Sequence, residues 1–142
     1  MIWLLRHAEA ADGSPDADRP LTTRGEEQAR AAGAAMVSIG VEVQACIASP
    51  KVRAADTARI ACAALGVSVE LDQALEGGPF DPEAVAAGRE NVLLVGHDPD
   101  FSMAIHRLTG AQVRMSKGGL AGVDRGELAA LLRPDDLAAI CF

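Results

Sequence analysis

Ile2-Trp3-Leu4-Leu5-Arg6-His7 is a short apolar run that ends abruptly in two basic residues. A second run, Asn91-Val92-Leu93-Leu94-Val95-Gly96-His97, has the same arrangement late in the chain. Short apolar runs that stop at polar residues are typical of buried strands in a parallel sheet. Ligands of such sheets bind outside the carboxyl ends of the strands. We therefore expect His7 and His97 to meet at one site if these two strands are neighbours.

The rest of the chain alternates between strand-like and helix-like patterns. Further strands are predicted at residues 43–48, 67–71, 120–123 and 127–132. Helices are predicted at about residues 22–38, 50–65, 82–87 and 100–108. The last two strands are joined by the turn Asp124-Arg125-Gly126, which favours an antiparallel pair. This order predicts a single α/β domain over residues 1–142, with three α/β/α layers and a mainly parallel central sheet that ends in antiparallel strands.

Two of the helix starts carry local signals. Either Thr22 or Thr23 is a possible cap, and the spacing of Thr23 and Glu26 fits a capping box. Pro50 is expected at the first position of the next helix, because proline is favoured there. Arg53 would then lie one turn into that helix.

The composition is that of an ordinary globular domain, with 49% hydrophobic and 23% charged residues in 142. The chain contains 28 alanines, only 3% aromatic residues and no tyrosine. We therefore expect a core built from small and aliphatic side chains, with closely packed helices. Few aromatic rings are left for stacking on nucleic-acid bases.

The formal net charge of −7 argues against nucleic acid or an anionic membrane surface as a partner. Any anion must then be captured by a local group of basic residues. No apolar segment approaches the roughly 20 residues that a membrane-spanning helix needs. We expect a soluble, cytoplasmic protein with no membrane partner.

Cysteine and histidine are few. Cys46, Cys62 and Cys141 each lie in an apolar context and form no CxxC pair, so they are interpreted as small buried hydrophobic residues. Together with three scattered histidines they show no metal-ligand spacing, and no metal site is predicted.

Basic residues accompany both predicted histidine positions. Arg6 adjoins His7, and Arg53 follows the strand that ends at Ser49. Guanidinium groups match the oxygens of phosphate or carboxylate in pairs and stay charged at any working pH. Two arginines and two histidines at one edge of the sheet predict an anion pocket in an otherwise acidic protein.

Four ordered blocks of this sequence resemble the histidine phosphatase superfamily. They are Leu4-Leu5-Arg6-His7-Ala8-Glu9-Ala10, Arg19-Pro20-Leu21-Thr22-Thr23-Arg24-Gly25, Ser49-Pro50-Lys51-Val52-Arg53-Ala54-Ala55-Asp56-Thr57-Ala58 and Val95-Gly96-His97-Asp98-Pro99. The blocks span most of the chain. The short length, the Arg-Pro-Leu-Thr block and Lys117-Gly118-Gly119 resemble the small SixA-type phosphohistidine phosphatases, within a phosphoglycerate mutase-like fold.

The resemblance implies a mechanism. His7 would be the nucleophile and become transiently phosphorylated, while Arg6, Arg53 and a protonated His97 would hold the phosphoryl oxygens. No metal or other cofactor would be required. The implied substrate is phosphohistidine in a signalling protein, and the protein itself is expected to be a monomer.

The proton donor is left open among Glu76, Asp18 and neither. Acidic residues occur near the position of Glu76 in many family members, and Asp18 precedes the Arg-Pro-Leu-Thr block. Arg19 is expected to line the rim, and Lys117 is either a turn residue or an aid to substrate recruitment. An imidazole leaves readily once protonated, so a dedicated acid matters less for phosphohistidine than for an alkyl ester.

Two other functions are considered. The chain is alternatively a phosphomonoesterase for a small phosphorylated metabolite, or a module that binds phosphate or phosphohistidine without turnover. The complete set Arg6, His7, Arg53 and His97 argues against the module, since binding alone needs no nucleophile. The short chain leaves no space for the insertion that covers the site in larger relatives, so we expect an open pocket.

Overall fold

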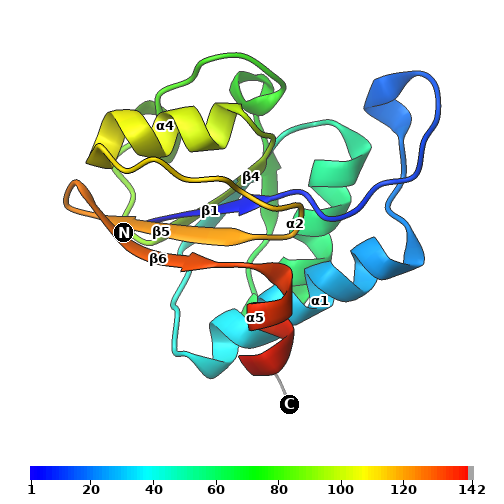
Figure 1. Ribbon diagram of the computed structural model, residues 1–142, viewed down its shortest axis with the longest axis horizontal. Helices are drawn as coiled ribbons and strands as arrows, with labels where there is room; N and C mark the ends of the chain where they lie inside the picture. Colours follow the sequence, from blue (N-terminus) through cyan, green and yellow to red (C-terminus); the bar gives the residue numbers. More distant parts are fainter. Residues whose placement is uncertain (141–142) are drawn as a thin grey trace.

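A computed structural model describes residues 1–140, which form a sheet with helices on both faces (Figure 1). The strands are β1 (Ile2–Arg6), β2 (Ala45–Ala48), β3 (Val69–Leu71), β4 (Val92–Gly96), β5 (Leu120–Asp124) and β6 (Glu127–Leu132). Their order across the sheet is β3-β2-β4-β1-β5-β6. The α/β class predicted from the sequence is thus confirmed.

Strand β1 lies at the centre of this arrangement. It pairs with β4 in parallel and with β5 in antiparallel orientation. Strand β2 is parallel to β4 and β3, and β6 is antiparallel to β5. The register pairs Arg6 with Gly96, so β1 and β4 end side by side, as the two histidine-terminated runs predicted.

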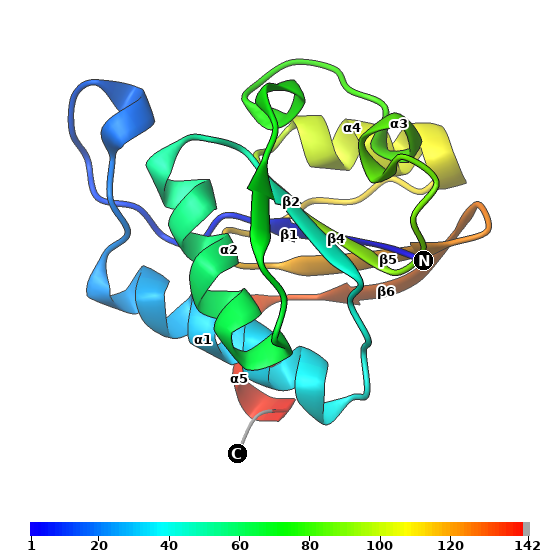
Figure 2. The same cartoon turned by 180° about the vertical axis from the view of Figure 1, so that it is seen from behind.

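The helices form two outer layers (Figure 2). Successive side chains of a strand point to opposite faces, so Leu5 and Leu4 belong to different clusters. Leu5 packs in the cluster beneath α1 (Thr23–Ser38), α2 (Val52–Leu65) and α5 (Pro134–Ile140). Leu4 packs in the cluster beneath α3 (Pro82–Ala86) and α4 (Asp100–Thr109). No helix within residues 1–140 is long and apolar enough to cross a membrane.

Helices α1 and α2 cross closely because small residues face each other. A Cβ atom added at Gly33 of α1 would lie 2.5 Å from the backbone oxygen of Ala61 in α2. Gly25 in the first turn of α1 lies similarly against the backbone oxygen of Glu9. The alanine-rich composition is therefore used for close helix contact, as expected.

Of the two helix starts that carry local signals, the first is confirmed with Thr22 as its cap, and the second, at Pro50, is wrong. Thr22, in extended conformation, caps α1, and its side chain accepts the Gly25 N–H at 3.0 Å. The capping box between Thr23 and Glu26 therefore does not form. Helix α2 begins at Val52 rather than Pro50, because the Ser49 hydroxyl accepts the Lys51 N–H at 3.2 Å in a turn that precedes the helix.

The structure also contains a C-terminal helix and two buried cysteines. Helix α5 was not predicted; it has only seven residues and carries two aspartates in its first turn. Cys46 and Cys62 are buried, as expected. A hydrogen bond with Cys62, together with burial, raises the pKa of Cys46, which keeps it a neutral thiol. The expectation for Cys141 lies outside the described residues.

Replacing Gly33 with alanine should destabilise the protein. At an open helix position this substitution gains up to about 1 kcal/mol, but here the added methyl group meets the Ala61 backbone, and overpacking typically costs about 1–3 kcal/mol. Urea unfolding measures the change. Ser38→Ala, at the exposed end of the same helix, is the control and should stay within about 0.5 kcal/mol of the parent protein. A Gly33→Ala variant as stable as its parent would contradict the close crossing.

Candidate functional site

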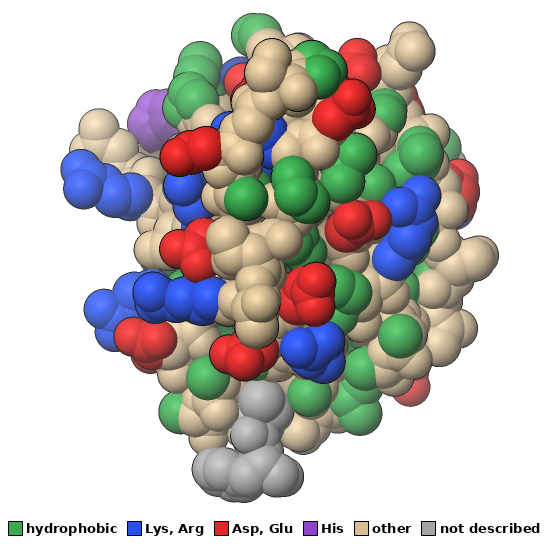
Figure 3. Space-filling model, turned by 90° about the vertical axis from the view of Figure 1, so that its right-hand side faces the viewer, with side chains coloured by type: hydrophobic (Ala, Val, Ile, Leu, Met, Phe, Trp, Pro, Cys, Tyr) green, Lys and Arg blue, Asp and Glu red, His purple; other side chains and the backbone are tan. Residues whose placement is uncertain are grey.

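A cavity of about 310 Å³ gathers the charged residues that follow the carboxyl ends of the parallel strands. Its lining consists of Arg6, His7, Arg19, Lys51, Arg53, Glu76, Gly77, His97, Asp98, Asp100 and Lys117. Every site residue predicted from the sequence is among them except Asp18. Figure 3 shows the side of the molecule toward which β1 runs, where Lys and Arg side chains gather with Asp and Glu among them.

His7 is held in one orientation by backbone groups. The backbone N–H of His7 donates to the backbone oxygen of Gly96 at 2.9 Å, which extends the β1–β4 ladder by one residue. The ring Nδ1 lies 2.8 Å from the Ala8 carbonyl oxygen. Because a carbonyl oxygen only accepts, Nδ1 carries the proton, and the neutral ring then has its lone pair on Nε2. The side chain is 6% exposed.

The Lys117-Gly118-Gly119 turn supports the backbone of Arg6 and His7. The Gly118 N–H donates to the oxygens of Arg6 and His7, at 3.2 and 3.0 Å, and the Arg6 N–H donates to the Gly119 oxygen at 3.0 Å. Gly118 has φ +77°, a conformation that favours glycine. The turn preceding β5 thus fixes β1 at its functional end and places Lys117 on the cavity.

His97 lies beside His7, with the ring centroids 5.3 Å apart. Its Nε2 is 2.8 Å from the hydroxyl oxygen of Ser49, which is fully buried. The bond to Ser49 leaves Nδ1 as the other ring nitrogen for a ligand. Sequence reasoning did not name Ser49 as a site residue, although its place directly after β2 repeats the positions of His7 after β1 and His97 after β4.

Both predicted arginines are anchored at their tips and carry an unpaired Nε. Arg6 donates through Nη1 to the Met115 oxygen at 2.6 Å. Arg53 donates through Nη1 to the Asp16 backbone oxygen at 2.9 Å and through Nη2 to Asp16 Oδ2 at 3.1 Å. Within residues 1–140, the Nε atoms of these two arginines are the buried side-chain nitrogens without a partner. A buried donor without an acceptor costs free energy, so both groups are suited to an incoming anion.

Thr57 connects Arg53 with the backbone after His7. Its hydroxyl donates to the Arg53 carbonyl oxygen at 2.6 Å and accepts the Ala8 N–H at 3.0 Å. Strand β1 and helix α2 are therefore joined directly beneath the cavity. Thr57 belongs to the block of residues 49–58 that resembles the superfamily, but the sequence indicated no role for it.

Asp16, which the sequence reasoning missed, lies at the basic side of the site. It is in the 3-10 turn η1 (Asp16–Asp18) and contacts Arg19, Lys51 and Arg53. Asp18 in the same turn is exposed and does not line the cavity. The structure therefore does not bring Asp18 to the place of a proton donor, because the turn directs Asp16 toward the basic residues instead. Arg19 lines the cavity, as expected.

Three acidic side chains also line the cavity. Asp98 accepts hydrogen bonds from the backbone and hydroxyl of Ser102, and Asp100 accepts the Gly78 N–H at 3.2 Å. Glu76 follows the 3-10 turn η2 (Gln73–Leu75), and within residues 1–140 its carboxylate has no such bond. Of the three, Glu76 is thus the acid free to serve a ligand.

Both histidines have lowered pKa values. Burial, followed by the charges of Arg53, Arg6 and Lys117, lowers the pKa of His7 to about 4, against a raising effect of the Ala8 hydrogen bond. Burial, followed by the nearby His7, lowers the pKa of His97 to about 3. His97 is therefore neutral at pH 7 in the protein alone. The protonated His97 that the resemblance implied depends on the negative charge that a substrate brings.

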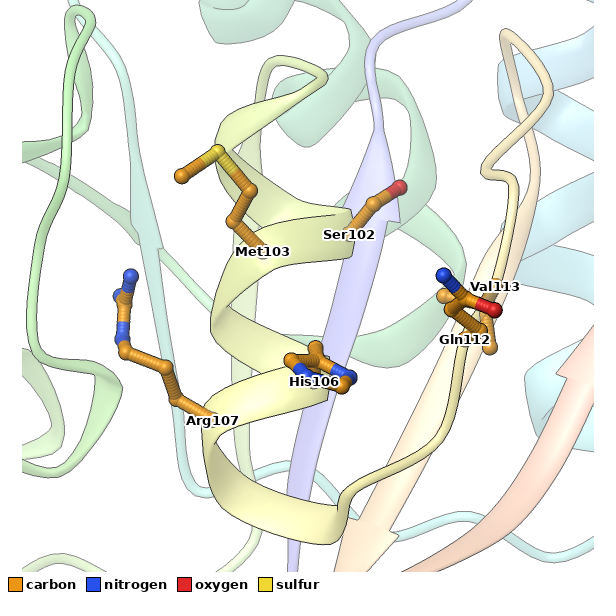
Figure 4. A pocket seen from close by; sticks show the side chains of 6 residues that line it. All are labelled: Ser102, Met103, His106, Arg107, Gln112 and Val113. Carbon is orange, nitrogen blue, oxygen red and sulfur yellow. The ribbon is translucent and has the colours of Figure 1, made fainter.

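A second hollow, of about 390 Å³, lies along α4 (Figure 4). In Figure 4, helix α4 carries Ser102, His106 and Arg107 on this hollow, and the following segment carries Gln112. Ser102 donates to Asp98, the His106 ring bonds the Ala111 oxygen, and Arg107 donates to the Phe80 oxygen. Within residues 1–140, the two buried side-chain donors without a partner belong to Arg6 and Arg53, which line the first cavity and not this hollow, so we place the candidate functional site in the first cavity. No group of three His, Cys, Asp or Glu residues within residues 1–140 is placed to hold a metal ion.

Similar proteins match either most of the chain or about three fifths of it. The chain is 31% identical over 140 residues to an uncharacterized protein of Picosynechococcus sp., covering 88% of the chain and 85% of the relative. It is 39% identical over 85 residues to the mitochondrial serine/threonine-protein phosphatase PGAM5 of Mus musculus. That match covers 58% of the chain and only 30% of the mouse protein.

Solved structures share the whole fold. The protein histidine phosphatase SixA complexed with tungstate superposes with a TM-score of 0.82 at 24% identity, covering 96% of this chain and 98% of SixA. A SixA protein from Nakamurella multipartitia superposes with a TM-score of 0.75 at 28% identity, covering 94% and 95% of the two chains. The sequence model of the histidine phosphatase superfamily (branch 1) matches residues 2–78, which contain Arg6, His7 and Arg53. The match extends over more than half of the chain, and the protein therefore belongs to this superfamily.

Proposed function

We propose that the protein is a metal-independent phosphatase that acts through a phosphorylated His7 and removes the phosphoryl group from phosphohistidine in a signalling protein. The observation that carries this proposal is the state of His7: a buried, neutral imidazole with its Nε2 lone pair available, between two arginines. Membership of the superfamily and the likeness to SixA and PGAM5 support phosphatase chemistry.

In the first step the Nε2 lone pair of His7 forms a bond to phosphorus, and the bond from phosphorus to the leaving group breaks. A neutral imidazole is the reactive form, and the lowered pKa provides it at pH 7. The hydrogen bond from Nδ1 to the Ala8 oxygen holds the ring and stabilises the positive charge that the ring gains. His7 therefore needs no separate base.

The phosphoryl oxygens are held by Arg6, Arg53 and His97. Phosphoryl transfer depends mainly on position and on charge stabilisation, and the two unpaired Nε–H groups supply fixed donors. The dianion favours protonation of His97, whose Nδ1 then also donates. The arginines thereby provide the positive charge for which other phosphatases use a metal ion.

The second step restores the enzyme. Water attacks phosphorus, the bond to Nε2 breaks, and inorganic phosphate leaves with a neutral His7 behind. The imidazole of a phosphohistidine substrate, which leaves in the first step, takes up a proton easily and so needs no buried acid, in keeping with the exposed position of Glu76. The exposed Lys117 and Glu76 beside the buried histidines indicate that the cavity opens to the surface, so that a histidine on another protein can enter.

A second candidate function is a phosphomonoesterase for a small metabolite. It is favoured by the position of Glu76, which lines the cavity and has no bond to another residue within residues 1–140. An alkoxide is a poor leaving group and needs such an acid. The third alternative, a module that binds without turnover, is opposed by the available Nε2 of His7.

His7→Ala should abolish turnover. We expect phosphate release from a phosphohistidine protein to fall more than about 10³-fold, because the group that forms the covalent bond is gone. The parent protein mixed with labelled substrate and quenched in alkali should retain label on His7, and acid should remove it. EDTA should leave the rate unchanged. Unchanged turnover in a folded His7→Ala protein would refute the mechanism, and tight phosphate binding without turnover by the parent would favour the module.

Glu76→Gln separates the two enzyme functions. For a phosphohistidine substrate we expect less than about a tenfold loss of kcat, whereas an alkyl phosphate should lose about 10²-fold or more if Glu76 is its acid. Asp18→Asn, a carboxylate outside the cavity, is the matched control for both substrates. Faster hydrolysis of esters than of phosphohistidine, together with a crippling effect of Glu76→Gln, would support the metabolite phosphatase instead.

The buried neutral histidines should make stability depend on pH. An unfolded histidine has a pKa near 6.5, against about 4 for His7 and about 3 for His97 in the fold. Below pH 6.5 the unfolded chain therefore binds more protons, and the free energy of unfolding falls by up to about 1.4 kcal/mol per pH unit for each histidine. Urea unfolding between pH 7.5 and 4.5 measures this slope.

In the same measurement, His7→Asn and His97→Asn should each reduce the slope. His106→Asn removes an exposed histidine and controls for a general effect of the substitution. If both site variants keep the full slope of the parent, the histidines are not held neutral by the fold.

A further inference from the structure

Three basic residues that line the cavity contact the carboxylate of Asp16, which does not line the cavity itself. Asp16 Oδ1 lies 3.2 Å from Arg19 Nη1, and Oδ2 lies 3.1 Å from Arg53 Nη2 and 3.6 Å from Lys51 Nζ. The η1 turn that carries Asp16 stands apart from the sheet, at the blue end of the colour scale in Figure 1. Of these three contacts, the one with Arg53 joins the turn to α2 itself.

The contact with Arg53 differs from the other two. Arg53 is 7% exposed, and Asp16 takes both of its terminal nitrogens, Nη1 through the backbone oxygen and Nη2 through Oδ2. A guanidinium group is planar, so two bonds to one residue fix its plane as well as its position. The nitrogen left without a partner is Nε, on the edge away from these two bonds.

We propose that Asp16 is a positioning residue, which holds Arg53 by its two tips so that the Nε edge is presented to the phosphoryl group. This role rests on the proposed function, since it assumes that a phosphoryl group binds in the cavity. Without the Asp16 carboxylate, Arg53 would keep its charge and an Nη1 bond to the backbone oxygen of the turn, but it would lose the Nη2 bond that fixes the plane of the guanidinium group. A hydrogen-bond donor that can rotate stabilises the transition state less than a donor held in one position.

The charge of Asp16 is suited to this role. Hydrogen bonds from Arg19 and then Arg53 lower its pKa to about 2, so the carboxylate stays ionised at any working pH. The competing possibility is that Asp16 only neutralises basic residues and so weakens anion binding. The two possibilities predict opposite effects when the carboxylate is removed.

The test compares Asp16→Ala and Asp16→Asn with Asp18→Ala. Asp18 lies in the same turn, is exposed and stays outside the cavity, so it is the matched control. We expect Asp16→Ala to lower kcat/KM about 10- to 100-fold, mainly through kcat, and to weaken inhibition by orthovanadate by a similar factor. Asp16→Asn keeps an oxygen acceptor and should recover part of both losses. Asp18→Ala should match the parent.

A second measurement does not depend on turnover. In the parent protein the Nε–H resonance of Arg53 should be sharp and should shift on addition of orthovanadate, and in Asp16→Ala it should be broadened or lost. The proposal is overturned if Asp16→Ala matches Asp18→Ala in both measurements, or if it binds orthovanadate more tightly with unchanged kcat. If the parent protein shows no turnover, the proposed function fails, whereas the resonance and orthovanadate binding still decide the role of Asp16. If Asp16→Ala does not fold, Asp16→Asn is compared with Asp18→Ala by the same criteria.

Discussion

The parallel pairing of β1 with β4 is the constraint on which the site depends. It places Arg6 opposite Gly96, and the ladder continues for one more hydrogen bond, from the His7 N–H to the Gly96 oxygen. The histidines that follow the two strands therefore lie at the same edge of the sheet, with the ring centroids 5.3 Å apart. The neighbours on either side add the remaining parts: β2 leads to Ser49 and α2, and the turn before β5 holds the backbone of Arg6.

This arrangement keeps the histidines neutral in a strongly basic pocket. Burial and neighbouring positive charge both oppose protonation of an imidazole, and at His7 and His97 they act together. The positive charges that oppose protonation of the histidines also favour the binding of an anion. The unpaired Nε atoms of Arg6 and Arg53 have the same consequence, since a ligand oxygen would satisfy them. The site is thus prepared for a phosphoryl group, at a cost to the stability of the protein alone.

Sequence reasoning located the strands and named residues that, except for Asp18, line one cavity, because these features are local. Apolar runs of four residues with a histidine two positions beyond them can be recognised without knowing the fold. It failed where the outcome depended on contacts between distant segments. The capping box between Thr23 and Glu26 does not form, because Thr22, the other possible cap, caps α1 and also bonds Glu9 from the loop after β1. Asp16 rather than Asp18 meets Arg53 because the η1 turn packs on α2, which lies 37 residues away in the chain.

The sequence by itself determined the type of fold, the residues that can carry phosphoryl chemistry and the acidic surroundings of one basic site. Only the tertiary structure decided which ring nitrogen of His7 is available, which nitrogens of the arginines are occupied, and which carboxylates reach the cavity. The physical reason is that strand formation follows from the side chains of a few successive residues, whereas protonation and hydrogen bonding follow from burial and from neighbours. Those neighbours, such as Ser49 for His97 and Asp16 for Arg53, come together only when the sheet and its helices have packed.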